Sequence, residues 1–236
     1  MTRAALMQAM EATWPAAETR RLGPWTIRDG RGGGKRVSAA TAEDSVGYGD
    51  IEQAEAAMIA LNQPCLFMIA EGENALDSEL QARGFAIIDP VVLYSVAVSD
   101  LTSAPIPPVS AFTIWQPLAI MADIWAAGGI GAARLAVMDR AKDPKTGVLA
   151  RHADQPAGAA FVAIHENTAM IHAIEVAPAH RRKGVGANIL RTAAHWAQDR
   201  GAANLGLAVT HANAGANALY ASLGMAVVGQ YHYRIK

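Results

Sequence analysis

The stretch that decides the fold is residues 171–187, which read IHAIEVAPAHRRKGVGA. This pattern predicts a strand, then Pro178, then a basic turn containing Gly184 and Gly186, then a helix. The first N–H groups of a helix have no partner within it and carry the positive end of its dipole. The glycines let a bulky anion approach this backbone, and the cations of residues 181–183 surround it. The segment therefore predicts a site for a phosphate or pyrophosphate.

Two other phosphate-binding patterns do not fit the residues. The dinucleotide-binding fingerprint needs a third glycine three positions after Gly186, where the chain has Ile189. The phosphate-loop pattern nearly occurs at residues 32–35, but it needs glycine in place of Asp29 and serine or threonine in place of Arg36. A basic surface run that merely begins a helix would explain the cations alone, and the paired glycines after a strand argue against it.

The turn resembles the core motif of the GNAT superfamily of N-acetyltransferases, Arg/Gln-x-x-Gly-x-Gly/Ala, here RRKGVG at residues 181–186. The resemblance includes the end of the preceding strand, VAP at residues 176–178, and YHYR at residues 231–234. Between them lies the pattern Asn213-x-x-Ala216-x-x-Leu219-Tyr220-x-x-x-Gly224. The resemblance implies a mixed α+β fold of the α/β type, with a central, mixed, partly splayed sheet flanked by helices.

In the GNAT family the strand before the motif splays from its neighbour, and the pantetheine arm of acyl-CoA lies in the gap. The resemblance thus implies that the backbone of Ile174 and Val176 binds pantetheine and that the amides of residues 182–187 bind the pyrophosphate. Asn213 matches the position that contacts the CoA arm. Arg181 and Arg182 could each simply be solvated cations. The predicted binding residues are Ile174, Val176, Arg181, Arg182, Lys183, Gly184, Val185, Gly186, Ala187 and Asn213.

Acyl transfer to an amine needs a neutral amine, a stabilised oxyanion and a proton for the departing thiolate. Tyr220 matches the family tyrosine that is often placed to protonate the CoA sulfur. It also belongs to an apolar stripe with Ala216, Leu219 and Leu223 at helical spacing, which is typical of a buried face. The two interpretations are compatible, because such a stripe can end at a cleft. We predict that Tyr220 is catalytic.

Glu175 is the predicted general base. An unpaired carboxylate is costly on a strand buried on both faces, so Glu175 must be paired or face the cleft, where it could take the amine proton directly or through water. By strand alternation His172 points to the opposite face, and a lone histidine is more often structural. His211, after a strand end, is a third candidate. Many N-terminal-amine acetyltransferases carry glutamate where this chain has Ala208, which argues against that substrate class.

Composition and charge limit the other functions. The formal net charge of -1 argues against nucleic-acid binding. Residues 1–103 hold 8 basic and 14 acidic residues, and residues 104–236 hold 12 and 7, so the second half is the better host for an anionic ligand. The spacing of His172, His180 and His211 matches no metal-ligand pattern, and Cys65 is the single cysteine. We therefore predict no metal site.

The same features bear on localisation. A single cysteine excludes an internal disulfide and suits a reducing cytoplasm. Residues 1–14 lack the apolar region of a signal peptide and read as an amphipathic helix. No stretch approaches the roughly 20 apolar residues that cross a bilayer. We expect a cytoplasmic protein with no membrane partner.

Periodicity, glycines and prolines predict the elements along the chain. Helices are expected at residues 3–14, 51–61, 75–82, 117–127, 132–141, 185–200 and 214–223. Strands are expected at residues 25–28, 36–40, 66–70, 85–98, 147–151, 157–164, 169–176, 205–210, 225–228 and 231–235. The first two strands are expected to form a hairpin through residues 30–34, and residues 147–151 and 157–164 could form another. Because strands alternate with helices after residue 169, parallel pairs should occur there.

The proline-rich segment DLTSAPIPPV at residues 100–109 is the best linker candidate. LQARGFAII at residues 80–88 echoes LYASLGMAVV at residues 219–228, which hints that the first half is a worn copy of the second. WTIR at residues 25–28 and GKRVS at residues 34–38 are similar to opening strands of tandem GNAT-like proteins. Residues 1–103 contain no Arg-x-x-Gly-x-Gly turn. We predict a degenerate GNAT-like domain at residues 1–103, which walls the acceptor pocket, and a catalytic GNAT domain at residues 104–236.

Together these features predict a transferase that moves an acetyl group from acetyl-CoA to an amine by direct attack in a ternary complex. Cys65 lies outside the motif region, so no covalent acyl-enzyme is implied. The sequence does not decide whether the acceptor is a small-molecule amine or a protein amine. A homodimer is the assembly to test. The alternative is a catalytically weak acyl-CoA sensor or regulatory module, which needs the turn but neither Tyr220 nor a base. Nucleic-acid binding through residues 181–183 would predict steep salt dependence and is disfavoured by the overall charge.

Overall fold

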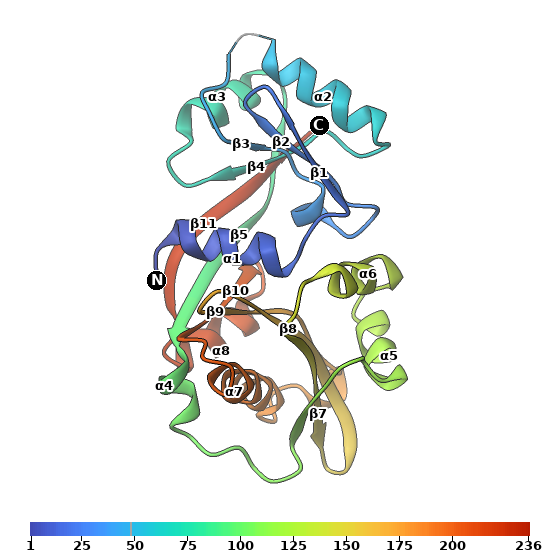
Figure 1. The fold of residues 1–236 in the computed structure, drawn as a ribbon, viewed down its shortest axis with the longest axis vertical. Coiled ribbons are helices and arrows are strands. Elements are labelled where there is room, and N and C mark those ends of the chain that lie inside the picture. Colours follow the sequence, from blue (N-terminus) through green and yellow to red (C-terminus); the bar gives the residue numbers. More distant parts are fainter. Residues whose placement is uncertain (48) are drawn as a thin grey trace. The chain divides into compact units, whose positions relative to one another are not determined.

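A computed structural model describes residues 1–47 and 49–236 of the chain (Figure 1). Packing groups these residues into two compact units. Unit 1 comprises Met1–Trp14, Leu93–Val209 and Asn213–Val228, and unit 2 comprises Pro15–Val92, Thr210–Ala212 and Gly229–Lys236. Each unit is assembled from several stretches of chain, so the division by packing crosses the predicted boundary at residues 103 and 104.

Unit 1 carries the predicted phosphate-binding turn. Its helices are α1 (Arg3–Thr13), α4 (Val98–Thr102), α5 (Ala119–Ala127), α6 (Ala132–Arg140), α7 (Val185–Gln198) and α8 (Ala214–Ser222), with the 3-10 helix η2 (Pro178–His180). Its strands are β6 (Ala111–Ile114), β7 (Lys145–His152), β8 (Gln155–His165), β9 (Thr168–Val176), most of β10 (Asn204–Thr210) and parts of β5 (Ala86–Ala97) and β11 (Ala226–Ile235). No helix among the described residues is long and apolar enough to span a bilayer.

Unit 2 has a small core of its own. Its elements are β1 (Glu18–Leu22), β2 (Trp25–Asp29), η1 (Lys35–Val37), β3 (Thr41–Ala42), α2 (Asp50–Ala60), β4 (Leu66–Ala70) and α3 (Asn74–Ala82), with the rest of β5 and β11. Strands β1, β2 and β3 form one antiparallel sheet. Three aromatic side chains, Trp25, Phe67 and Phe85, contact one another in this core in tilted and edge-on arrangements and are at most 2% exposed.

The second sheet follows the strand order β4-β11-β5-β10-β9-β8-β7-β6. Strands β6 to β9 pair antiparallel in sequence, so the hairpin predicted between residues 147–151 and 157–164 is confirmed. Strands β9 and β10 pair in parallel, as the alternation of strands and helices predicts. The mixed, helix-flanked sheet of the predicted fold is therefore present.

One predicted strand pairing is wrong. Strand β2 pairs with β1, which precedes it, and residues 36–40 form the end of η1 and an irregular segment. The sequence of β1, ETRRL, is almost wholly exposed and lacks the apolar alternation that predicts strands. The guanidinium of Arg28, buried in β2, donates to the carbonyl of Ala39 at 3.0 Å. This bond holds the later segment against β2 by a side chain, where the prediction expected a backbone ladder.

The sheet of unit 1 is covered on both faces. Phe161 of β8 packs its ring 6.1 Å from Trp14, which ends α1. Its partner on β7, Gly147, faces Met121 of α5. Gly158, three positions before Phe161, faces side chains of α7 instead. Because side chains of a strand alternate between faces, α1 and α5 cover one face and α7 covers the other.

The echo in the sequence corresponds to two copies of the same local structure. Helices α3 and α8 both end before a glycine in the left-handed region, with φ +86° at Gly84 and +74° at Gly224. In each copy the amide after the glycine donates to the carbonyl five residues earlier, that of Leu80 or Tyr220. A strand follows each glycine, β5 in one copy and β11 in the other. Leu80 of the first copy thus occupies the position of Tyr220 in the second.

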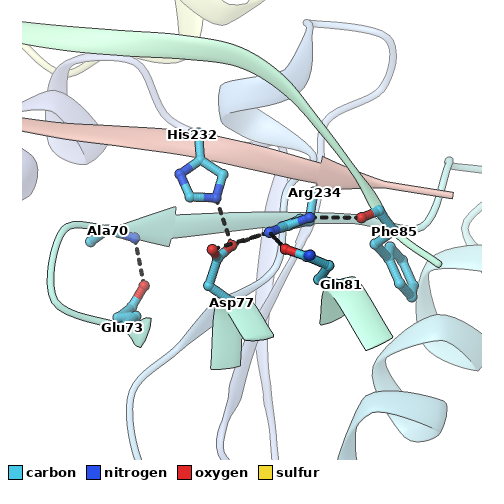
Figure 2. A network of polar contacts seen from close by, with 7 residues as sticks. All are labelled: Ala70, Glu73, Asp77, Gln81, Phe85, His232 and Arg234. Atoms are coloured by element: carbon cyan, nitrogen blue, oxygen red, sulfur yellow. Dashed lines mark hydrogen bonds and ion pairs between the residues drawn. The ribbon is translucent and has the colours of Figure 1, made fainter. Parts of the chain in front are cut away.

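In unit 2 an ion-pair network ties β11 to α3 (Figure 2). The guanidinium of Arg234, 3% exposed, donates through Nε to Asp77 Oδ1 at 2.8 Å and through Nη2 to Asp77 Oδ2 at 3.1 Å. Its Nη1 donates to the carbonyl of Phe85 at 2.9 Å, and His232 lies 2.7 Å from the same carboxylate. Hydrogen bonds from Arg234, helped by His232, hold the pKa of the Asp77 carboxyl below its ordinary value. The buried guanidinium is therefore fully paired.

Replacing Asp77 by asparagine should destabilise the protein by about 1.5–3 kcal/mol at neutral pH, because a charged hydrogen-bond partner of a buried guanidinium is lost. The folded pKa of Asp77 lies below the unfolded value of about 4, so the deficit should be full above that value and vanish as the pH falls through the folded pKa. Urea unfolding at several pH values measures it. Asp123→Asn, at an exposed position of α5, is the control for loss of charge alone. An equal deficit at pH 7 and pH 2 would contradict the assignment.

Candidate active site

The predicted anion-binding turn lies between η2 and α7 and is exposed to solvent. Two of its residues have left-handed backbone, with φ +62° at Arg182 and +82° at Gly184, a conformation that aims successive N–H groups toward one side. Among residues 1–47 and 49–236, no group accepts a well-formed hydrogen bond from the amides of residues 182–187. These donors therefore have the geometry and the spare capacity that an anion requires.

The two glycines of the turn have different physical roles. A Cβ on Gly184 would meet nothing within 4 Å, so glycine is needed there for its positive φ. A Cβ on Gly186 would lie 2.8 Å from Cδ2 of Leu219, so glycine is needed there to let α8 pack against the first turn of α7. The sequence argument gave both glycines to the approach of an anion. The structure adds a helix-packing role for Gly186.

Strand β9 separates from its parallel neighbour β10 after a short paired segment. The described register pairs Thr168, Ala169 and Met170 with residues 204–206 and does not continue toward the turn. Ile174 and Val176 thus lie in the part of β9 that has no ladder to β10. This partly splayed pair is the arrangement that the resemblance implies for an acyl-CoA arm.

A β-bulge in β9 changes which way its side chains point. Between the pairs Phe161 with His172 and Ala159 with Glu175, β9 advances three residues while β8 advances two. The extra residue, Ala173, has φ +51°. Paired residues share a face, so His172 and Glu175 point to the same face. The prediction from simple alternation, that they point to opposite faces, is wrong because the bulge shifts the phase.

The bulge is held from α5 and positions Glu175. The indole N–H of Trp125 donates to the carbonyl of Ala173 at 2.8 Å. Glu175 then lies against the C-terminal end of α5, where a Cβ on Gly128 would approach its Oε2 to 2.5 Å. The Glu175 side chain is 19% exposed and accepts a hydrogen bond from Nη2 of Arg181 at 3.2 Å. It is therefore paired, one of the two states that the sequence argument allowed.

Arg181 connects the strand to the turn. Besides Glu175, its guanidinium donates through Nε to the carbonyl of Val176 at 3.0 Å, and 59% of its side chain is exposed. The Val176 carbonyl is one of the groups that the resemblance assigns to pantetheine. Arg181 is thus not a simply solvated cation, and a ligand that needs this carbonyl has to displace its Nε.

The other candidate bases lie in different surroundings. His172 is 4% exposed, with Nε2 2.8 Å from the Thr13 hydroxyl and its ring 5.0 Å from the Trp14 ring, which favours the structural interpretation. His211 is exposed, and its backbone amide donates to the carbonyl of Pro90 in unit 2. Within the described ranges, no group of three or more histidine, cysteine or acidic side chains is arranged to hold a metal ion.

Tyr220 lies on α8 and is 5% exposed. Burial, with a smaller contribution from Tyr94, raises the pKa of Tyr220 to about 12, so it is a neutral proton donor at physiological pH. No described residue hydrogen-bonds its hydroxyl. Asn213 caps the same helix, its side-chain oxygen accepting the N–H of Ala216 at 3.1 Å. One helix therefore carries the predicted acid and, at its first turn, the predicted CoA contact.

Sequence reasoning missed Tyr94, Asn217, Trp125 and Gly128. Trp125 and Gly128 act on a bulge in a distant strand, for which neither periodicity nor motif gives a signal. The sequence did offer one signal for Tyr94. If the internal similarity is continued past Gly84 and Gly224, Tyr94 aligns with Arg234, the last residue of the YHYR segment. This site residue lies within the stretch predicted to be the non-catalytic domain.

A splayed parallel pair, an exposed glycine turn and a buried tyrosine on the next helix are the features expected of the GNAT fold. The model of the acetyltransferase (GNAT) family matches residues 119–225. Over these residues the chain is similar to GNAT acetyltransferases, a family that uses acetyl-CoA as cosubstrate. The unpartnered amides of the turn fit the pyrophosphate of that cosubstrate.

Two curated relatives carry acetyltransferase names. The chain is 26% identical over 235 residues to the uncharacterized N-acetyltransferase YobR of Bacillus subtilis, covering 95% of each chain. It is 49% identical over 59 residues to streptothricin acetyltransferase of Streptomyces lavendulae, covering 25% of this chain and 31% of that protein.

Solved structures share the fold at low sequence identity. A GCN5-related N-acetyltransferase from Kribbella flavida superimposes with a TM-score of 0.72 at 19% identity, covering 100% of this chain and 96% of that one. A tandem GNAT protein from the clavulanic acid biosynthesis pathway superimposes with a TM-score of 0.60 at 11% identity, covering 98% and 87%. The second similarity agrees with the duplicated helix–glycine–strand unit within this chain.

Replacing Gly184 by alanine should weaken acetyl-CoA binding by roughly tenfold or more. A left-handed alanine costs about 1–2 kcal/mol, and the turn can relieve that strain by rotating its amides away from the anion. The matched control is Gly201→Ala, because Gly201 follows the other end of α7 with φ +79°. Calorimetric titration of both variants gives the affinities. Equal losses of affinity would mean that strain alone, not the turn, is responsible.

Proposed function

We propose that this protein is an acyl-CoA-dependent N-acetyltransferase that transfers an acetyl group from acetyl-CoA to an amine by direct attack in a ternary complex. The observation that carries this proposal is the exposed turn at residues 182–187, whose amides donate no well-formed hydrogen bond to any described residue. A diphosphate satisfies these donors and lies at the positive end of the α7 dipole. The family match supports acetyl-CoA as the ligand that brings it.

Binding of the cosubstrate would rearrange Arg181. A pantetheine amide on β9 competes with Arg181 Nε for the Val176 carbonyl, while the nearby pyrophosphate offers the guanidinium a stronger, doubly charged partner. Movement of Arg181 toward the phosphate would also break its bond to Glu175. We infer that acetyl-CoA binds first and releases the carboxylate for the second substrate.

In the transfer step, the amine nitrogen forms a bond to the thioester carbonyl carbon, and the bond from that carbon to sulfur breaks. Glu175 takes the proton that the amine loses, directly or through water, and Tyr220 donates a proton to the departing sulfur. The products are an amide and free CoA, and solvent restores the proton on Tyr220 and removes that on Glu175. A phenol with a pKa of about 12 keeps its proton at neutral pH until a thiolate forms beside it.

We propose a small-molecule amine as the acceptor. The local similarity to streptothricin acetyltransferase, 49% identical over 59 residues, supports this class. The absence of glutamate at Ala208 argues against an N-terminal protein amine in the same direction. A panel of small amines and peptides, followed by detection of released thiol, tests the choice. Turnover confined to peptides would reject it.

Titration with acetyl-CoA, followed by the same panel, tests the function as a whole. Micromolar binding with turnover of at least one amine is the expected result. Absence of binding would reject the acyl-CoA assignment. Binding without turnover of any amine would instead favour the sensor, which uses the turn alone.

Tyr220→Phe should lower kcat by about 10²-fold or more, the range of general acid catalysis, and leave acetyl-CoA affinity nearly unchanged. The ring and its packing remain, and only the proton donor is lost. Steady-state kinetics and calorimetry together separate the two effects. A variant with full kcat would remove Tyr220 from the mechanism.

Glu175→Gln should lower kcat by about 10²-fold at neutral pH, because the carboxylate that accepts the amine proton is gone. Glutamine keeps the size that fits against Gly128. Steady-state kinetics at neutral pH is the measurement. A variant with the wild-type kcat would assign the base to another residue.

A further inference from the structure

Tyr94 contacts the helix that carries the proposed acid in two ways. Its hydroxyl donates to the side-chain oxygen of Asn217 at 3.1 Å, and its ring centroid lies 5.6 Å from that of Tyr220 at 58°. Tyr94 itself is 8% exposed, so neither contact is exchanged freely with water. All three residues belong to unit 1.

Through Asn217, Tyr94 is connected both to Asn213 at the start of α8 and to the turn that carries Tyr220. Asn217 lies one turn before Tyr220 and donates through Nδ2 to the carbonyl of Asn213 at 2.8 Å. A hydrogen bond at this point fixes the rotation of α8 about its axis relative to β5. On the other side, Leu219 fills the space that the missing side chain of Gly186 leaves open. The direction of the Tyr220 ring is therefore set by Tyr94 and by the contact of α8 with α7.

The same positions are used in unit 2 with different chemistry. Aligning Gly84 with Gly224 places Asp77 opposite Asn217 and Tyr94 opposite Arg234. In unit 2 the strand residue Arg234 donates to the helix residue Asp77, as Tyr94 donates to Asn217 in unit 1. The strand-to-helix anchor thus occurs in both copies. It is charged in the copy without the turn and uncharged in the copy with Tyr220.

We propose that Tyr94 is a positioning residue for Tyr220: its hydroxyl locks α8 through Asn217, and its ring fixes one side of the Tyr220 phenol. This inference rests on the proposed function, because Tyr220 must act as the acid for its direction to affect the rate. It assigns a part in the active site to β5, which the sequence placed in the non-catalytic half.

A double-mutant cycle in kcat tests the proposal. Tyr94→Phe keeps the ring and removes the hydrogen bond to Asn217. It should lower kcat by about tenfold, which is within the ~10²-fold cost of misplacing a reacting group. The affinity for acetyl-CoA should stay within about twofold of the wild-type value. In a Tyr220→Phe background the same change should have no further effect on kcat. A residue that only stabilises the fold would give losses that multiply. Asp77→Asn, the equivalent break in unit 2, is the control and should lower the melting temperature without changing kcat.

A second measurement does not depend on turnover. In protein labelled with 3-fluorotyrosine, the Tyr220 resonance is identified by its loss in Tyr220→Phe. It should be a single narrow signal in the wild type and should broaden or split in Tyr94→Phe. If the wild type turns over no amine but this change occurs, the positioning stands and the proposed function fails. If the wild type is active and the losses of kcat from the two substitutions multiply, or the Tyr220 resonance is unaffected, the positioning role is overturned and the proposed function stands.

Discussion

The structure depends on amides that the protein leaves unsatisfied. The first N–H groups of any helix need partners from outside it, and most helices find them in a capping side chain or in water. At the start of α7 no described residue caps the helix with its side chain or accepts a well-formed bond from the first amides, and Arg182 and Gly184 adopt left-handed backbone. Glycine at position 184 lowers the free-energy cost of this conformation. Strand β9, the splayed partner β10 and the packing of α8 all serve to present this turn.

The bulge in β9 converts that turn into a site with chemistry. Without the extra residue at Ala173, strict alternation would place Glu175 on the face covered by α7. With it, Glu175 lies beside Gly128 and pairs with Arg181, the first residue of the motif. Trp125 donates to the carbonyl of Ala173, the residue that the bulge inserts into the strand. The bulge thus brings the proposed base next to Arg181, the first residue of the proposed anion-binding motif.

The sequence could predict those features that depend on residues close together along the chain. The strand, turn and helix of residues 171–187 are contiguous, and the demand of a helix N-terminus for partners can be read from neighbouring residues alone. The helices α1, α2, α3, α5, α6, α7 and α8 were predicted closely because apolar periodicity and terminal glycines are also local signals. The short helix α4 was missed, because its residues were assigned to the end of a strand and to a linker. Strand β1 was missed because its polar sequence carries no such signal. Tyr94, Gly128 and Trp125 were missed because each acts through a contact with a segment far along the chain, and the phase error at Glu175 followed from a bulge that no pattern marks.

The two copies of the helix–glycine–strand unit share one scaffold and differ in the side chains that they carry. Both keep the helix, the left-handed glycine and the anchor from strand to helix, because these determine how the unit folds. Leu80 stands at the position of the proposed acid in the copy without the turn, and there the anchor is the ion pair of Arg234 with Asp77. Next to Tyr220 such a guanidinium would favour the phenolate and lower the pKa that burial raises. The uncharged pair of Tyr94 and Asn217 holds the helix with equal geometric restraint and leaves burial to keep the proton on Tyr220. The two copies therefore share the position of the anchor and differ in its charge.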